Sequence, residues 1–220
     1  MTNLTRRHFG AALTAGLAIP MLPDAVSARA QSGTSFYVAV GPDLTQYAMD
    51  GATIAPIEGS TVSAPAAIQY VWQHPARPIV YVASSNRFTS TSDDQHHATA
   101  FAMAPGTGKL SMIGQPTPLS SRPINITMDK TGRFLLVAYN GPSSLTAHPI
   151  AADGTVGAAI QQDGKLDTGV YAHQVRLLPS NRTALLVTRG NDAAGGKPED
   201  PGALKTFSFD RGRLSNKQSV

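Results

Sequence analysis

The chain has 220 residues, of which 41% are hydrophobic and 15% charged, so it is able to bury a substantial core. Its formal charge is +4, but residues 1–30 contain three arginines and one aspartate, and the rest of the chain carries only +2. So small an excess gives no reason to expect a nucleic acid or an anionic membrane as a partner. The complete absence of cysteine excludes disulfides, thiolate metal sites and a cysteine nucleophile.

Residues 1–30 have the pattern of a twin-arginine signal peptide. The pair Arg6-Arg7 precedes a modest apolar run, residues 11–22, which is short and rich in glycine and alanine. A membrane-spanning helix needs about 20 strongly apolar residues, so we do not expect a membrane span after signal removal. Ala28-Arg29-Ala30 places small residues where a signal peptidase cuts, before Gln31. The sequence therefore predicts a periplasmic or secreted protein that follows the twin-arginine route.

A repeat runs through residues 31–220. Three apolar segments align with one another: Ile79–Ala83, Phe134–Ala138 and Ala184–Thr188. A turn with proline or glycine precedes each of them, and another β-like stretch precedes each turn. The turns are His74–Arg77, Asp129–Arg133 and Pro179–Arg182, and the earlier stretches are Ile68–Trp72, Ile124–Met128 and His173–Leu178.

Each repeat continues with further strands. Third strands are expected at Thr99–Met103, Ser144–Pro149 and Leu204–Phe209, and fourth strands begin near Leu110 and Val156 after short glycine turns. A similar turn at Asp210–Leu214 begins the same pattern, and residues 36–49 give an earlier, partial copy. Four antiparallel strands at a period of about 40–50 residues indicate the blade of a β-propeller. The predicted fold class is therefore all-β.

Two alternatives concern the architecture. A two-sheet sandwich also has many short strands, but it gives no reason for a long-range period. About 190 mature residues at roughly 50 residues per blade give three to four blades, and propellers need a closed ring. The chain stops at Ser219-Val220, where we expect a fourth strand to begin. We therefore expect a fragment of a larger propeller, with a closed four-bladed ring as the alternative.

Several motifs together resemble the lactonase family of seven-bladed propellers, which includes propeller-type 6-phosphogluconolactonases and fungal carboxymuconate cyclases. The segments that carry the resemblance are Arg122–Ile126, Asp129–Asn140, Asp153–Val156, Ala172–Val175, Pro179–Arg182 and Arg189–Asp192. The resemblance covers about residues 35–215 and implies that about half of a seven-bladed ring is present. The sequence departs from the family at Ala172, where proline is usual, at Thr188–Asp192, and in an inserted loop after Asp192.

Opening a lactone needs a base that activates water and donors that hold the developing oxyanion, and neither requires a metal or a cofactor. The best candidate base is His173, at the start of an innermost strand, and the resemblance points to the same histidine. The candidate substrate-binding residues are Arg122, which suits a carboxylate or phosphate, Asn140, Gln174 and Asp192. Four of the five have a structural alternative. His173 could be hydrogen-bonded between blades, Arg122 could be a solvated surface arginine, Asn140-Gly141 could be a hairpin turn, and Asp192 could have a turn role.

Two other features are interpreted as structural. His96-His97 with Asp93-Asp94 has the composition of a metal cluster, but adjacent residues on a strand point to opposite faces. A solvated loop that leads into a strand is the better interpretation, so no metal site is expected. Trp72, the only tryptophan, lies in an apolar stretch and is expected in the core.

The sequence predicts a lactonase-like hydrolase, or a muconate-type cyclase, acting on a small-molecule lactone or sugar acid. Export disfavours a phosphorylated sugar, since phosphorylated sugars are cytoplasmic, and so favours an unphosphorylated lactone or a carboxymuconate-type substrate. One alternative is a noncatalytic exported propeller that binds a ligand or a protein. Another is an inactive truncated chain whose ring does not close.

Overall fold

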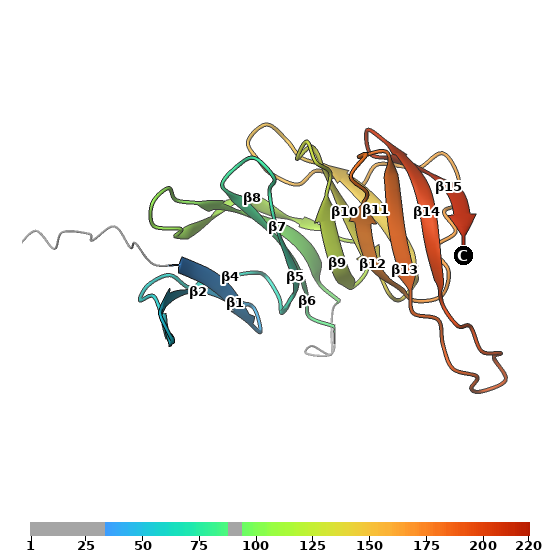
Figure 1. Ribbon diagram of the computed structural model, residues 1–220, viewed down its shortest axis with the longest axis horizontal. Helices are drawn as coiled ribbons and strands as arrows, with labels where there is room; N and C mark the ends of the chain where they lie inside the picture. Colours follow the sequence, from blue (N-terminus) through green and yellow to red (C-terminus); the bar gives the residue numbers. More distant parts are fainter. Residues whose placement is uncertain (1–33, 88–93) are drawn as a thin grey trace, which may run out of the picture. The chain divides into compact units, whose positions relative to one another are not determined.

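The computed structural model describes residues 34–87 and 94–220 (Figure 1). Within these ranges the chain forms strands, turns and bends and no helix, and so no helix that could cross a membrane. The predicted signal peptide, residues 1–30, lies outside the described residues.

The strands form four antiparallel sheets in chain order. The first contains β1 (Thr34–Val40), β2 (Asp43–Asp50), β3 (Thr53–Pro56) and β4 (Val62–Ser63). The second contains β5 (Ile68–Gln73), β6 (Ile79–Ser85), β7 (His96–Met103) and β8 (Leu110–Pro118). The third contains β9 (Pro123–Met128), β10 (Phe134–Tyr139) and β11 (Ser144–Pro149). The fourth contains β12 (Ala172–Leu177), β13 (Thr183–Thr188), β14 (Ala203–Asp210) and β15 (Arg213–Ser219).

The repeat inferred from the sequence is confirmed: the three aligned segments are β6, β10 and β13, each second in its sheet. Two details of the prediction were wrong. The fourth strand expected at Val156 is reduced to a single bridge with Ile150. The fourth strand expected to be missing at the end of the chain is present as β15, paired with β14 from Asp210↔Arg213 to Lys205↔Ser219.

The core lies between consecutive sheets, because the second strand of a blade is covered on both faces. In β6, Val80 and Val82 face the first sheet, whereas the alternating residues Ile79, Tyr81 and Ala83 pack on the third. In β10, Leu136 and Ala138 pack on the fourth sheet and the intervening residues on the second. This two-sided burial explains why both strands are continuous apolar runs rather than alternating ones.

Hydrogen-bonded turns join the sheets at the end where β9 meets β10. The carboxylate of Asp129 accepts hydrogen bonds from the amides of Thr131, Arg133 and Phe134 at 2.6–3.0 Å. It also accepts from the side-chain amide of Asn181, in the corresponding turn of the fourth sheet, at 3.3 Å. These bonds lower the pKa of Asp129 despite its burial, so the carboxylate stays ionised as an acceptor for both turns.

The opposite end of the sheets brings together the residues of interest. The first strands begin beside the ends of the second strands, in the pairs Ile68↔Ser84, Pro123↔Tyr139 and Ala172↔Thr188. We call this the entry end. The first strands β5, β9 and β12 also lie side by side, through hydrogen bonds from Arg176 of β12 to β9 and β5. This is the arrangement of innermost strands in neighbouring propeller blades.

Candidate active site at the entry end

A pocket of about 650 Å³ opens at the entry end between the third and fourth sheets. Three segments form it: the β10–β11 turn, the approach to β12, and the β13–β14 loop. Two predicted site residues, Asn140 and Asp192, line it together. Its other lining residues are Gly141, Pro142, Ser143, Gly169, Val170, Tyr171, Asn191, Ala194, Gly195 and Lys197.

His173 lies at a β-bulge two residues beyond the pocket-lining Tyr171. The register of β12 against β13 shifts between Ala172 and Gln174, so His173 has no partner in the ladder and its side chain is exposed. A bulge re-aims a side chain and frees backbone groups from the ladder. It therefore gives His173 the access to solvent that a base acting on water needs.

The third sheet fixes the backbone on both sides of this bulge. The hydroxyl oxygen of Ser143 accepts a hydrogen bond from the amide of Ala172 at 2.9 Å. The side-chain oxygen of Asn125, which is 2% exposed, accepts one from the amide of Val175 at 2.9 Å. Moving either backbone amide would break its hydrogen bond and cost free energy. The two acceptors therefore fix the backbone on both sides of His173.

The β10–β11 turn that carries Asn140 is itself held in place. The carbonyl oxygen of Gly141 accepts hydrogen bonds from the Ser121 hydroxyl at 2.7 Å and from Nη1 of Arg87 at 3.1 Å. The Ser143 hydroxyl donates to the carbonyl of Thr168, and the Thr168 hydroxyl donates to the carbonyl of Ser143, both at 2.9 Å. Asn140 is thus in a hairpin turn, as one interpretation held, and on the pocket wall at the same time.

Tyr139, just before this turn, takes no part in the pocket. It is fully buried, its hydroxyl contacts that of Thr146 at 2.9 Å, and burial raises its pKa to about 12.

Arg122 and Gln174 lie at the entry end but do not line the pocket. Arg122 is not the solvated surface arginine of the alternative interpretation. Its side chain is half-buried, and Nε donates to the side-chain oxygen of Gln69 on β5 at 2.9 Å. Gln174 is exposed beside His173.

Arg176 on β12 is a residue that the sequence analysis missed. Its guanidinium donates to Asn125 on β9 at 3.1 Å and to the hydroxyl of Tyr70 on β5 at 2.9 Å. It also lies 4.8 Å from the centroid of the Trp72 ring. Trp72 was expected in the core. It packs against the core but is only half-buried, with the Arg176 guanidinium over its ring. Only the side-by-side placement of the three first strands makes this contact possible.

The interpretation of His96-His97 as a solvated loop was wrong. Both residues lie in β7, opposite Ser85 and Ser84 of β6. His96 is 7% exposed, its Nδ1 lies 2.9 Å from the Ser85 hydroxyl, and burial lowers its pKa more than the neighbouring Asp94 raises it. The histidines are part of the sheet because residues 98–101, which follow them, belong to the buried centre of the strand.

The chain matches one known protein family over most of its length. The model of the family described as "Lactonase, 7-bladed beta-propeller" matches residues 34–194, most of the described chain. The chain belongs to this lactonase family. Its all-β sheets and its partial propeller are those expected of a family member.

Two curated relatives are named 6-phosphogluconolactonase. The protein of Serratia proteamaculans is 30% identical over 126 residues, and that of Pectobacterium carotovorum is 33% identical over 125 residues. The matches cover 57% and 56% of this chain. They cover 34% and 33% of the relatives, so the matched part of this chain spans about a third of their length.

Solved structures agree on the fold. A putative 6-phosphogluconolactonase from Bacteroides uniformis superposes with a TM-score of 0.62 at 14% identity, covering 81% of this chain and 48% of its own. A periplasmic gluconolactonase from Pseudomonas aeruginosa gives a TM-score of 0.56 at 18% identity, covering 84% and 68%.

Proposed function

We propose that this chain is part of an enzyme that hydrolyses the lactone of a sugar acid, with His173 as the general base. The observation that carries the proposal is the bulge at His173. It exposes the imidazole two residues after Tyr171 of the pocket wall, although His173 does not itself line the pocket, and Ser143 and Asn125 of the preceding sheet fix the backbone on either side. Membership of the lactonase family supports the same reaction.

The chemistry needs only groups that the entry end provides. The imidazole of His173 takes a proton from water as the water oxygen attacks the lactone carbonyl carbon. The side-chain amide of Asn140 is able to donate a hydrogen bond to the resulting oxyanion. When the ring C–O bond breaks, the leaving alkoxide takes the proton back from the imidazolium, and the product is a hydroxy acid.

The test is turnover of a lactone panel by the full chain and by His173→Ala. The panel holds an unphosphorylated sugar lactone, its 6-phosphorylated analogue and a muconolactone. Loss of a positioned base lowers kcat/KM by about 10²–10⁴-fold, and added imidazole restores part of the rate. His173 is exposed, so an unchanged melting temperature will show that the variant folds. Equal rates for the variant and the wild type would sink the assignment of the base.

A muconate-type cyclase and a noncatalytic binding propeller are the competing functions. Turnover of the muconolactone alone would identify the cyclase. Binding of the sugar acid with no turnover of any lactone by the wild-type chain would favour the noncatalytic propeller. Turnover of the three lactones by the wild-type chain, together with binding of the sugar acid, therefore separates all three functions.

We also propose that residues 1–30 direct export by the twin-arginine route, which Arg6-Arg7 and the short apolar run support. Replacing both arginines by lysine should leave the chain in the cytoplasm of a bacterial host, whereas the unaltered chain reaches the periplasm. Equal distribution of the two forms in cell fractions would contradict the proposal.

A further inference from the structure

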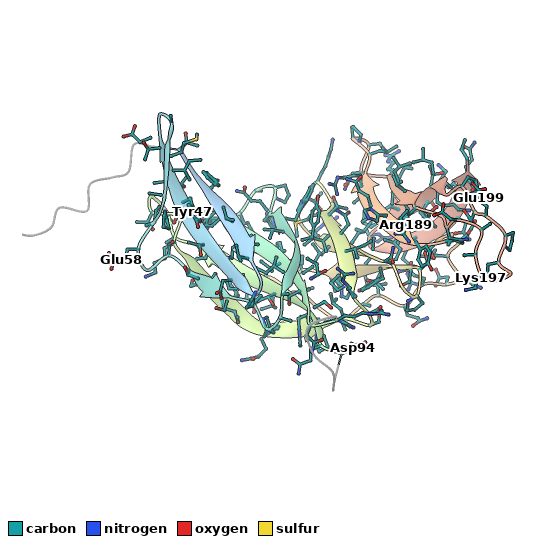
Figure 2. The ribbon with its side chains drawn as sticks, turned by 90° about the horizontal axis from the view of Figure 1, so that it is seen from below. Tyr47, Glu58, Asp94, Arg189, Lys197 and Glu199 are labelled. Atoms are coloured by element: carbon teal, nitrogen blue, oxygen red, sulfur yellow. The ribbon has the colours of Figure 1, made fainter. Side chains whose placement is uncertain are left out.

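The β13–β14 loop, residues 189–202, is a closed hairpin that forms one wall of the pocket. Asn191 and Asp200 exchange two backbone hydrogen bonds at 2.9 Å, and Ala194 and Lys197 exchange two at 3.0 and 3.2 Å. The side-chain amide of Asn191 also donates to the carbonyl of Pro198 at 3.1 Å. The loop, on which Figure 2 labels Lys197 and Glu199, therefore has its own ladder. Ala194, Gly195 and Lys197, at and near its tip, line the pocket.

Two glycines close the base of this hairpin. A Cβ at Gly190 would lie 2.0 Å from the carbonyl oxygen of Asp200, and one at Gly202 would lie 2.5 Å from that of Thr188. Both residues have positive φ, 71° and 80°. Backbone packs on backbone at this point, which only glycine allows, so the base of the hairpin is rigid.

The hairpin gives the pocket both of its charged residues. Among the residues that line the pocket, Lys197 is the only cation and Asp192 the only carboxylate. In the described part of the chain, neither belongs to any of the ion pairs. The ammonium and the carboxylate are thus both available to a ligand, and the formal charge of the pocket is zero.

We propose that Lys197 binds the carboxylate of an unphosphorylated sugar acid, while Asp192 accepts hydrogen bonds from the hydroxyls of that acid. This inference rests on the proposed function, because the acid is the product of lactone opening. A lysine ammonium is a point charge that pairs with one anionic group. A phosphorylated sugar acid brings about two further negative charges near neutral pH, which Asp192 repels. Lys197 is the only cation among the lining residues, and the nearby Arg189 guanidinium is already stacked on the Tyr171 ring.

The rest of the pocket wall divides into polar and apolar parts that suit different parts of the ligand. Asn140, Ser143 and Asn191 offer donors and acceptors for sugar hydroxyls, and Pro142 and Val170 offer apolar surface to ring carbons. The Tyr171 ring lies beneath the guanidinium of Arg189, 4.8 Å from its centroid, which holds this side of the wall in place. A mixed wall of this kind suits a polyhydroxylated ring with one charge.

The experiment is calorimetric titration of the full chain with gluconate, 6-phosphogluconate and neutral methyl glucoside. We expect wild type to bind gluconate more tightly than 6-phosphogluconate. Lys197→Met should weaken gluconate about fivefold to tenfold, because it removes one charge-assisted contact, and leave methyl glucoside unchanged. Lys109→Met, which makes the same charge change in the exposed β7–β8 turn, should alter nothing. Asp192→Asn should reduce the preference for gluconate over its phosphorylated analogue.

Gluconate affinity that is the same in wild type and Lys197→Met would overturn the inference. Failure of wild type to bind gluconate, or tighter binding of 6-phosphogluconate, would also overturn it. Binding that depends on Lys197 without any lactone turnover would uphold the anion site and refute only the proposed function. If turnover depends on His173 but gluconate binding does not depend on Lys197, the proposed function is upheld and the anion site is refuted.

Discussion

Two threonines, the buried Thr99 and the half-buried Thr146, have opposite hydrogen-bonding environments. The hydroxyl of Thr99, on β7, is buried and has no hydrogen-bond partner. The hydroxyl of Thr146, on β11, lies 2.9 Å from both the Tyr139 hydroxyl and Nε2 of His148. A buried polar group without a hydrogen-bond partner lowers the stability of the folded protein. Removing one group of a hydrogen-bonded pair therefore destabilises the protein, because the other group is left without a partner.

Replacing each threonine by valine keeps the shape and removes the hydroxyl. We expect Thr99→Val to raise the free energy of unfolding by about 1 kcal/mol, and Thr146→Val to lower it by about 1–3 kcal/mol. Urea unfolding of the two variants measures the difference. The explanation fails if both variants shift stability in the same direction.

His148 makes the stability of the third sheet depend on pH. Its Nδ1 donates to the carbonyl of Gly157 at 2.9 Å, because a carbonyl only accepts, so Nε2 accepts from Thr146. Burial lowers the pKa of His148 below its ordinary value of 6.5. The folded protein therefore binds fewer protons than the unfolded chain between the lowered pKa and 6.5.

Stability should accordingly be full above about pH 6.5 and fall as the pH decreases toward the lowered pKa. His74, His96 and His97 have pKa values lowered mainly by burial and add to the same trend. Urea midpoints measured from about pH 8 to pH 5 test this, and His148→Gln should flatten the slope. A slope unchanged by His148→Gln, and changed by substitution of the exposed His173, would contradict this assignment.

At the scale of the element, the bulge at the start of β12 depends on a turn in another sheet. The Ser143 hydroxyl oxygen holds the amide of Ala172, whereas the hydroxyl of the neighbouring Ser144 donates to the carbonyl of Pro142, at 3.3 Å. The position of His173 is therefore coupled to the β10–β11 turn.

Ser143→Ala should speed hydrogen exchange of the Ala172 amide about tenfold, which corresponds to the loss of a bond of about 1.4 kcal/mol. Ser144→Ala is the matched control and should leave that amide unchanged. Exchange measured residue by residue by NMR decides between them. Equal protection of the Ala172 amide in both variants would mean that Ser143 does not anchor the bulge.

At the scale of the whole molecule, β6 and β10 each belong to two core clusters and so link all four sheets. A change in the fourth sheet should reach the second through the third. Trp72 reports on this, because it is the only tryptophan and lies in the second sheet.

Leu186→Ala, at a fully buried position in the fourth sheet, should destabilise the protein by about 2–5 kcal/mol. We expect it to shift the unfolding transition seen by Trp72 fluorescence as far as the one seen by circular dichroism. A shift confined to circular dichroism would show that the sheets unfold separately, as weakly coupled repeats do.

The sequence by itself determined the repeat and hence the fold. Continuous apolar runs such as 134–138, preceded by the Asp129 turn, depend on local chemistry: two-sided burial and a carboxylate that binds its own turn amides. It also identified His173, Asn140 and Asp192 as candidates, and all three lie at the entry end of the sheets. These signals are local in the chain, so they are readable without the structure.

Only the tertiary structure decided which of these residues meet. The bulge that exposes His173 forms between β12 and β13 of the fourth sheet. The contact of Arg176 with Tyr70, 106 residues earlier, and the pocket shared by Asn140, Asp192 and Lys197 form between sheets. The partner residues lie far apart in the chain, and the local sequence of one segment does not indicate which other segment it will contact. The strand pattern that predicts a blade does not specify how neighbouring blades pack against each other. That packing brings the candidate site residues together.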